Sequence, residues 1–186
     1  MQFYTVKAFG AVEEFIKIDT GLNVIKDACR KSEIQYLDRK IITIAASESG
    51  GIEFPDLIIY EDMYLFSNDV IDQIKKEIEE YVFLKPIEIT CDVIGKKELY
   101  WLIVPPRIDC LDLDNSEVED EWDFELGIIP VLHCKKTRID EKLVGNFEVF
   151  KIAEIDDNNI YINENIKNKI ININPEGIKI IAIKEE

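Results

Sequence analysis

The sequence predicts an α+β fold, with a single domain, a mostly antiparallel sheet and two or three packing helices. Isoleucine occurs 33 times among the 186 residues, and its branched Cβ favours strands over helices. Apolar and aromatic residues make up 47% of the chain, which is enough for a sizeable core. Short apolar segments typical of strands alternate with a few segments of helical periodicity.

The first 51 residues are expected to form two strands and a short helix. Residues 2–8 alternate aromatic and polar side chains and predict a first strand. Residues 23–36 place apolar side chains at helical spacing and predict a short helix. Residues 41–46 are a compact apolar run, typical of a buried strand, and residues 47–51 are expected to be a loop.

The clearest helix in the sequence covers residues 69–81. Either Ser67 or Asn68 can cap it, because each side chain offers an oxygen to the free N–H groups of the first turn. Pro86 follows a few residues after its end. One face of this helix carries the apolar residues Val70, Ile71, Ile74, Ile78 and Tyr81.

The rest of the chain is expected to contain mostly strands. Residues 87–93 and 99–104 predict a pair around a turn, and Pro105-Pro106 ends the second strand because proline has no N–H to donate. Asn163 is expected to cap a third helix over residues 163–171. The remaining strands are expected at residues 128–134, 147–155, 160–162 and 178–183.

Residues 109–125, here called the acidic segment, contain nine Asp or Glu residues and no Lys or Arg. They therefore carry −9 of the net charge of −16. A field concentrated in this way repels nucleic acid, attracts basic proteins and speeds encounter with them. The candidate binding residues are Asp112, Asp114, Glu117, Glu119, Asp120, Glu121, Trp122, Asp123 and Glu125.

Several features predict a cytoplasmic protein. The first residues lack the basic region, the long apolar stretch and the cleavage site of a signal peptide. No apolar run approaches the roughly 20 residues that a membrane span requires. Nucleic acid is not an expected partner, because no basic stripe is present to neutralise phosphates. The four cysteines, Cys29, Cys91, Cys110 and Cys134, form no CxxC motif and are expected to be ordinary buried thiols.

Sequence motifs for catalysis are weak. The single histidine, His133, precedes Cys134 in an expected strand, where adjacent side chains point to opposite faces and cannot form a nucleophile–base pair. The loop at residues 47–51 lacks the spacing of a phosphate-binding loop. Carboxylate pairs are numerous, but their spacing selects none as a general acid and base. We therefore expect no enzyme, no catalytic residue and no cofactor.

A calcium-binding loop is one interpretation of the acidic segment. With Asp112 in the first position of an EF-hand loop, the ninth position is Asp120. The sixth position, which requires Gly for a sharp turn, is Glu117, and the twelfth is Asp123 instead of the longer Glu. We therefore expect no specific metal site.

Three other interpretations of the acidic segment remain. It can be a docking surface for a basic protein, with Trp122 as an aromatic anchor inside a charged rim, although Trp122 can equally fold back into the core. It can belong to a carboxylate-rich cleft in an enzyme or a small-ligand-binding or metal-binding domain. It can also be a solvated loop that only aids solubility.

Several short motifs after residue 54 occur in an order that resembles the Imm11 family, immunity proteins encoded in bacterial polymorphic toxin systems. The motifs are Pro55-Asp56, Ser67 before the helix, Tyr100-Trp101, and Asp112 followed by Ser116 within the segment PPRIDCLDLDNSEV. A strand–turn–helix–strand unit over residues 147–183 completes the resemblance. It covers residues 55–185 well and the first 50 residues poorly.

The resemblance implies a cytoplasmic protein that binds and neutralises a cognate toxin in a stoichiometric complex, without catalytic residues. We expect an N-terminal portion over residues 1–54 and an Imm11-like region over residues 55–186, within one compact domain. The acidic excess fits a basic toxin domain, for example a nuclease, because carboxylates can occupy a site that binds substrate phosphates.

Overall fold

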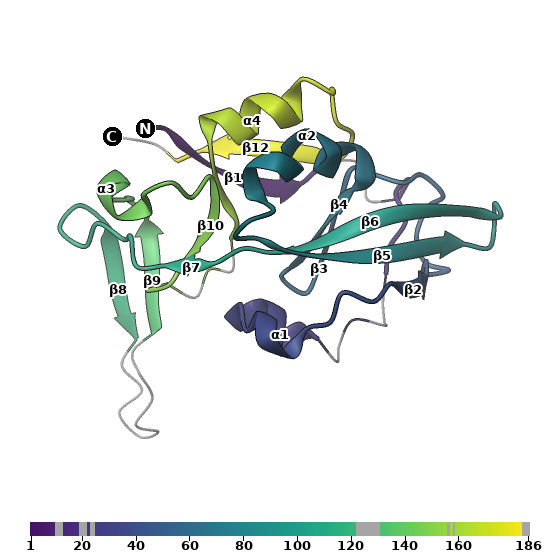
Figure 1. Cartoon of the computed structure of the whole chain (residues 1–186), viewed down its shortest axis with the longest axis horizontal. Coiled ribbons are helices and arrows are strands. Elements are labelled where there is room, and N and C mark those ends of the chain that lie inside the picture. Colours follow the sequence, from purple (N-terminus) through teal and green to yellow (C-terminus); the bar gives the residue numbers. More distant parts are fainter. Residues whose placement is uncertain are drawn as a thin grey trace.

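The computed structural model describes residues 1–9, 13–18, 22, 25–121, 131–155, 157 and 159–183. These residues form an α+β fold of two five-stranded sheets, a two-stranded hairpin and four short helices (Figure 1). The helices are α1 (Lys26–Lys31), α2 (Asn68–Ile78), α3 (Glu141–Val144) and α4 (Glu164–Ile171), and one 3₁₀ turn covers Ile34–Tyr36. The expected α+β class is therefore confirmed, although the described residues form four helices and not the expected two or three.

The first sheet contains strands from both ends of the chain. Its order is β12 (Ile178–Ala182), β1 (Phe3–Ala8), β11 (Tyr161–Asn163), β10 (Val149–Ile152) and β7 (Arg107–Ile108). Strand β1 is antiparallel to both of its neighbours, with Tyr4 opposite Ile162 on one side and Ala182 on the other. Strand β7 runs parallel to β10.

The second sheet is built around a long hairpin. Its order is β2 (Ile42–Ala45), β5 (Phe83–Cys91), β6 (Lys96–Val104), β4 (Met63–Ser67) and β3 (Leu57–Tyr60). Strands β5 and β6 pair along their whole length, from Phe83 opposite Val104 to Cys91 opposite Lys96. Strand β2 runs parallel to β5 at the edge. A separate hairpin pairs β8 (Glu117–Glu121) with β9 (Val131–Lys136).

The expectation of a mostly antiparallel sheet is wrong, because there are two sheets and each of them is mixed. In each sheet the parallel pair lies at an edge, β7 beside β10 and β2 beside β5. Parallel neighbours are joined by long connections, so local sequence patterns do not reveal them. Strand β7 also directly follows Pro105-Pro106, where the sequence predicts that pairing stops.

Helices α2 and α4 pack together above the sheets in Figure 1. Their fully buried residues, each no more than 1% exposed, are Val70, Ile71, Ile74, Ile78, Ile166 and Ile170. These side chains share one apolar cluster with Val6 of β1 and Phe66 of β4. The two sheets therefore meet in a common core beneath these helices.

Helix α1 covers the opposite face of the second sheet (Figure 1). Its Cys29 is buried in a second apolar cluster that contains Leu65 of β4. On β5, Lys85 is only 1% exposed, and its ammonium group donates to Asp38 O (2.9 Å), Asp38 Oδ1 (2.7 Å) and Lys40 O (2.7 Å). Because every N–H of this ammonium group has an acceptor, a charged side chain is tolerated there.

Several expected elements are confirmed with slightly different ends, namely β1, α2, the β5–β6 hairpin, α4 and β12. The helix expected over residues 23–36 is interrupted, because Ser32 adopts a left-handed conformation (φ 56°) after α1. The strand expected over residues 41–46 is not buried as a whole: β2 is an edge strand in which only Ile44 is buried. The β3–β4 hairpin lacks a turn signal, since Glu61 and Asp62 take the positive φ values that usually favour Gly or Asn.

A polar junction around Pro55-Asp56, here called the Asp56 junction, fixes the start of α2. The hydroxyl of Ser67 donates to the Asp56 carboxylate and accepts from Val70 N (3.4 Å), so Ser67 is the helix cap. Asp56 and Glu176 exchange two hydrogen bonds, from Asp56 N to Glu176 O (2.8 Å) and from Glu176 N to Asp56 Oδ2 (2.7 Å). The hydroxyl of Tyr100, 1% exposed, donates to Pro55 O (2.5 Å).

We predict that Ser67→Ala lowers the free energy of unfolding by about 0.5–2 kcal/mol, because the first turn of α2 loses its side-chain acceptor. Urea denaturation of both proteins measures the difference. Ser67→Thr is the matched control, since it keeps the hydroxyl and should retain most of the stability. An alanine variant as stable as the parent would show that the Ser67 hydroxyl adds nothing.

Candidate functional site

The acidic segment begins on a buried anchor. Its second and third residues, Cys110 and Leu111, are buried. The carboxylate of Glu154 accepts hydrogen bonds from Cys110 N (3.3 Å) and Leu111 N (3.0 Å), and Asp140 N donates to Cys110 O (2.9 Å). These contacts join the start of the segment to the core, although Asp109, which precedes the two buried residues, is exposed.

Residues 112–116 form a turn that Asp112 closes. Its carboxylate accepts from Asn115 N (3.2 Å) and from Asn115 Nδ2 (2.7 Å). Asp112 N donates to Arg138 O (2.9 Å), and Arg138 N donates to Ser116 Oγ (3.0 Å), which ties the turn to the segment after β9. The Asp112 carboxylate is thus engaged inside the turn, whereas Asp114 is exposed.

The middle of the acidic segment, residues 117–121, is a strand and not a loop. Strand β8 pairs with β9, and the register shifts after Glu117, which lies opposite Lys136. Val118 lies opposite Cys134, and both pack against a third apolar cluster. Four of the five residues of β8 are acidic and poor strand formers, so the strand depends on pairing with β9.

The structure places the predicted binding residues in different situations. Asp114 and Glu117 are exposed, and Asp112 is half-buried in its turn. Glu119, Asp120 and Glu121 lie along β8, opposite His133, Leu132 and Val131. Trp122, Asp123 and Glu125 lie outside the described residues.

A pocket of about 410 Å³ lies beside the turn of the acidic segment. Its lining includes Asp112 and Asn115 from the turn, Met1, and Ile183, which directly follows β12. The amino group of Met1 forms an ion pair with Glu141 of α3. Sequence reasoning missed this pocket, because only the pairing of β1 with β12 brings the two ends of the chain to the acidic segment.

Cys29, Cys91 and Cys110 are buried as expected, whereas Cys134 is only half-buried. Two of these thiols, Cys29 and Cys110, are not suited to nucleophilic chemistry. Burial raises the pKa of Cys29 to about 11 and that of Cys110 to about 12, so both thiols stay protonated near neutral pH. Among the residues that the structure describes, no group of three or more His, Cys, Asp or Glu side chains is placed to hold a metal ion. Within the same residues, no helix has the length and apolar character needed to cross a membrane.

A model of the Imm11 immunity protein family matches residues 69–185, well over half of the chain. The chain belongs to the Imm11 immunity protein family. The Imm11 match begins inside α2 and includes the acidic segment and β12, so the resemblance is confirmed from residue 69 onward. Membership implies a cognate toxin as partner, and immunity proteins are typically not enzymes. No curated protein matches the sequence.

The residues that carry the resemblance to Imm11 have structural roles. Ser67 caps α2, and Tyr100 makes a buried hydrogen bond to Pro55 O. Asp112 and Ser116 close the turn at the start of the acidic segment. In this structure each of these residues makes a contact that holds the fold together.

A lysine side chain, that of Lys151, is buried in the first sheet. Lys151 of β10 is 4% exposed, and burial, with a smaller contribution from the charge of Arg107, lowers its pKa to about 8. Cys29, Asp62 and Asp157 act in the opposite direction and only partly offset this effect. In the unfolded chain Lys151 has the ordinary lysine pKa of 10.5. Between pH 8 and pH 10.5 the unfolded chain is therefore protonated at Lys151 to a greater extent than the folded protein.

We therefore predict that Lys151→Met raises the free energy of unfolding at pH 7 by about 1–3 kcal/mol. Below about pH 8 the folded wild type holds Lys151 in its charged form, and the free energy of unfolding is lowered by the full penalty of burying that charge. Above pH 8 the folded protein releases this proton, so the penalty shrinks as the pH rises towards 10.5. The difference in free energy of unfolding between the variant and the wild type should be much smaller at pH 10 than at pH 7. Urea denaturation of both proteins at pH 7 and pH 10 measures it. Lys142→Met, which removes an exposed lysine, is the control. A constant advantage at both pH values would contradict the pKa assignment.

Proposed function

We propose that this Imm11 protein neutralises its toxin by stoichiometric binding and that the acidic segment is the main docking surface. The observation that carries the proposal is the charge of −9 in this one segment. Lys136, opposite Glu117, offsets part of the charge at the start of β8. Further along the ladder, Glu119 lies opposite His133 and Glu121 lies opposite Val131.

The toxin domain that fits such a surface is basic. A nuclease is the natural example, because a protein that binds nucleic acid needs cationic side chains at its phosphate sites. The carboxylates of Asp114 and Glu117, which are exposed, can take the place of substrate phosphates there. The competing interpretation, an enzyme with a carboxylate-rich cleft, is disfavoured by the Imm11 membership.

The direct test uses the C-terminal domain of the protein encoded immediately upstream of this chain, here called the upstream-encoded domain. We expect the two proteins to co-purify in a one-to-one complex and the activity of the upstream-encoded domain to disappear at that ratio. A complex that does not form, or forms without inhibition, would overturn the proposed function.

We predict that association of the two proteins slows as salt rises, because exposed charges steer encounter through a screened field. Stopped-flow rates should be compared at ionic strengths of about 0.01 M and about 0.15 M, where the Debye length falls from about 30 Å to about 8 Å.

Neutralising four acids of the segment, as in Asp114→Asn/Glu117→Gln/Glu119→Gln/Glu121→Gln, should remove most of this dependence. The matched control makes the same charge change at exposed positions of α2 and just after it, as in Asp69→Asn/Asp72→Asn/Glu79→Gln/Glu80→Gln. If both variants lose the salt dependence of the association rate equally, the net charge of the protein and not the acidic segment causes it.

We predict that Trp122→Ala weakens toxin binding more than any single Asp or Glu change in the segment. A desolvated aromatic anchor contributes about 2 kcal/mol or more, whereas a solvated rim carboxylate contributes about 0–1 kcal/mol. Titration calorimetry and a thermal melt should be run on the same variant. A loss of about 3–5 kcal/mol in stability would instead make Trp122 a core residue.

A further inference from the structure

Strand β12 is an edge of the first sheet, and β1 is its only neighbour among the described strands. Two hydrogen bonds mark which residues face β1, from Phe9 N to Gly177 O (2.8 Å) and from Ile183 N to Phe3 O (3.0 Å). Because hydrogen-bonded and non-hydrogen-bonded pairs alternate in an antiparallel ladder, the residues between them point the other way. The backbone N–H and C=O groups of Ile178, Ile180 and Ala182 therefore face the open edge.

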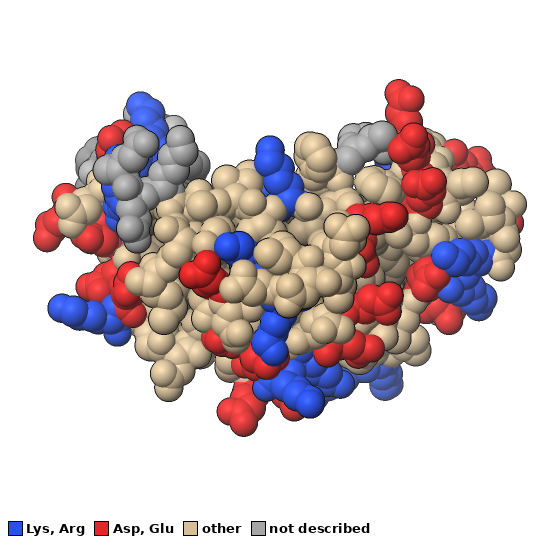
Figure 2. Space-filling model, turned by 90° about the horizontal axis from the view of Figure 1, so that it is seen from above, with Lys and Arg blue, Asp and Glu red and all other residues tan. Residues whose placement is uncertain are grey.

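Strand β12 has few of the features that normally keep an edge strand from pairing with another chain. Edge strands usually discourage pairing with charged side chains, prolines or bulges. Strand β12 contains one charged residue, Lys179, and no proline. Ile181 of β12 is 41% exposed, and Ile171 at the end of α4 is 47% exposed. Figure 2 looks down on this side of the molecule, where uncharged side chains fill most of the centre and acidic residues gather towards the margins.

A pocket of about 280 Å³ lies beside the open edge of β12. It lies between α4 and β12, and its lining includes Ile178 and Ile180 together with Ile171 and Pro175. Side chains of alternate residues along a strand share one face, so a strand added beside β12 would present its own alternate side chains to this pocket. The remaining lining residues are Tyr4, Lys167 and Asn174, so the pocket has both apolar and polar walls. An edge with an adjacent side-chain pocket is the arrangement that extended peptides recognise.

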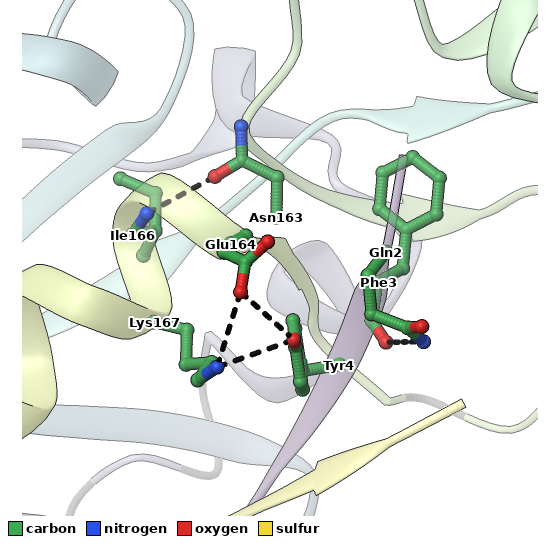
Figure 3. A network of polar contacts seen from close by, with 7 residues as sticks. All are labelled: Gln2, Phe3, Tyr4, Asn163, Glu164, Ile166 and Lys167. Carbon is green, nitrogen blue, oxygen red and sulfur yellow. Dashed lines mark hydrogen bonds and ion pairs between the residues drawn. The ribbon is translucent and has the colours of Figure 1, made fainter. Parts of the chain in front are cut away.

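One wall of the pocket is held rigidly by charged and aromatic groups (Figure 3). The ammonium group of Lys167 lies 4.5 Å from the ring centre of Tyr4 and donates to its hydroxyl (3.2 Å). The same ammonium group pairs with Glu164 (3.4 Å), and the Tyr4 hydroxyl donates to that carboxylate (3.4 Å). Asn163 caps the helix that carries both residues, through Ile166 N (3.0 Å). The pocket is thus shaped before any ligand arrives, which lowers the cost of binding.

We propose that β12 accepts an extended segment of the toxin as an additional strand, with one apolar side chain in the pocket between α4 and β12. This inference rests on the proposed function and describes a second part of the same interface. Ile183 directly follows β12 and lines the pocket that also contains Asp112 and Asn115. A partner docked on the acidic segment therefore lies next to the C-terminal end of the open edge.

Charge favours the toxin over a second copy of this chain as the occupant. Two copies paired edge to edge would bring together two molecules of net charge −16 each. A basic toxin is attracted by the same field that repels another copy. The added segment is therefore expected to be apolar where it meets the pocket and basic where it approaches the acidic segment.

The test is a substitution that blocks the edge without breaking the ladder to β1. In Ala182→Pro the lost N–H faces the open edge, and proline is tolerated at such positions of edge strands. We expect this variant to keep its thermal stability and to bind the upstream-encoded domain about tenfold or more weakly, because a main-chain hydrogen bond is lost and the ring obstructs pairing. Ala182→Val keeps the N–H and is the matched control, with affinity close to that of the wild type.

Amide hydrogen exchange on the wild-type complex gives a readout that needs no variant. The N–H groups of Ile178, Ile180 and Ala182 should become protected when the upstream-encoded domain binds, whereas those of Lys179 and Ile181 are protected with and without it. Unchanged exchange together with unchanged affinity of Ala182→Pro would overturn the strand addition and leave the proposed function standing. A wild-type chain that binds nothing would overturn both. A homodimer that Ala182→Pro abolishes, seen by sedimentation of the chain alone, would assign the edge to a second copy.

Discussion

The carboxylate of Asp56 holds three distant parts of the chain together. One oxygen accepts the Ser67 hydroxyl at the start of α2, and the other accepts the N–H of Glu176 just before β12. Asp56 itself immediately precedes β3, so a single side chain joins the second sheet, the main helix and the edge of the first sheet. Gly177 completes this join: its φ is +76°, and a Cβ there would lie 2.8 Å from Pro55 Cβ. The position of β12 relative to α2 and α4 depends on these contacts.

The sequence predicted the elements whose signals are local. Helices α2 and α4 were identified because a capping side chain precedes an apolar stripe, and both caps, Ser67 and Asn163, are confirmed. The β3–β4 hairpin was missed because Glu61 and Asp62 form its turn at positive φ, and the turn contains neither Gly nor Asn. The parallel edge strands β2 and β7 escaped prediction for a different reason, since their partners lie far away in sequence.

The sequence predicted the negative charge of the candidate site but not its secondary structure. Counting acidic residues located the segment, yet its strand arises from pairing with β9 and from the contact of Val118 and Cys134 with the core. The Glu154 carboxylate then fixes the other end of the segment through Cys110 and Leu111. These contacts order the start of the acidic segment and the strand Glu117–Glu121 in the folded chain. The pocket between the chain ends has no local sequence signal at all.

The pairing of β1 also governs the order in which the chain can fold. Both neighbours of β1 come from the end of the sequence, with Tyr4 opposite Ile162 and Ala182. During synthesis β1 is therefore paired late, because β11 and β12 follow it by more than 150 residues. The second sheet, complete by residue 104, can form well before that. We expect folding in two stages, with closure of the first sheet slow because it must bring together residues separated by most of the chain.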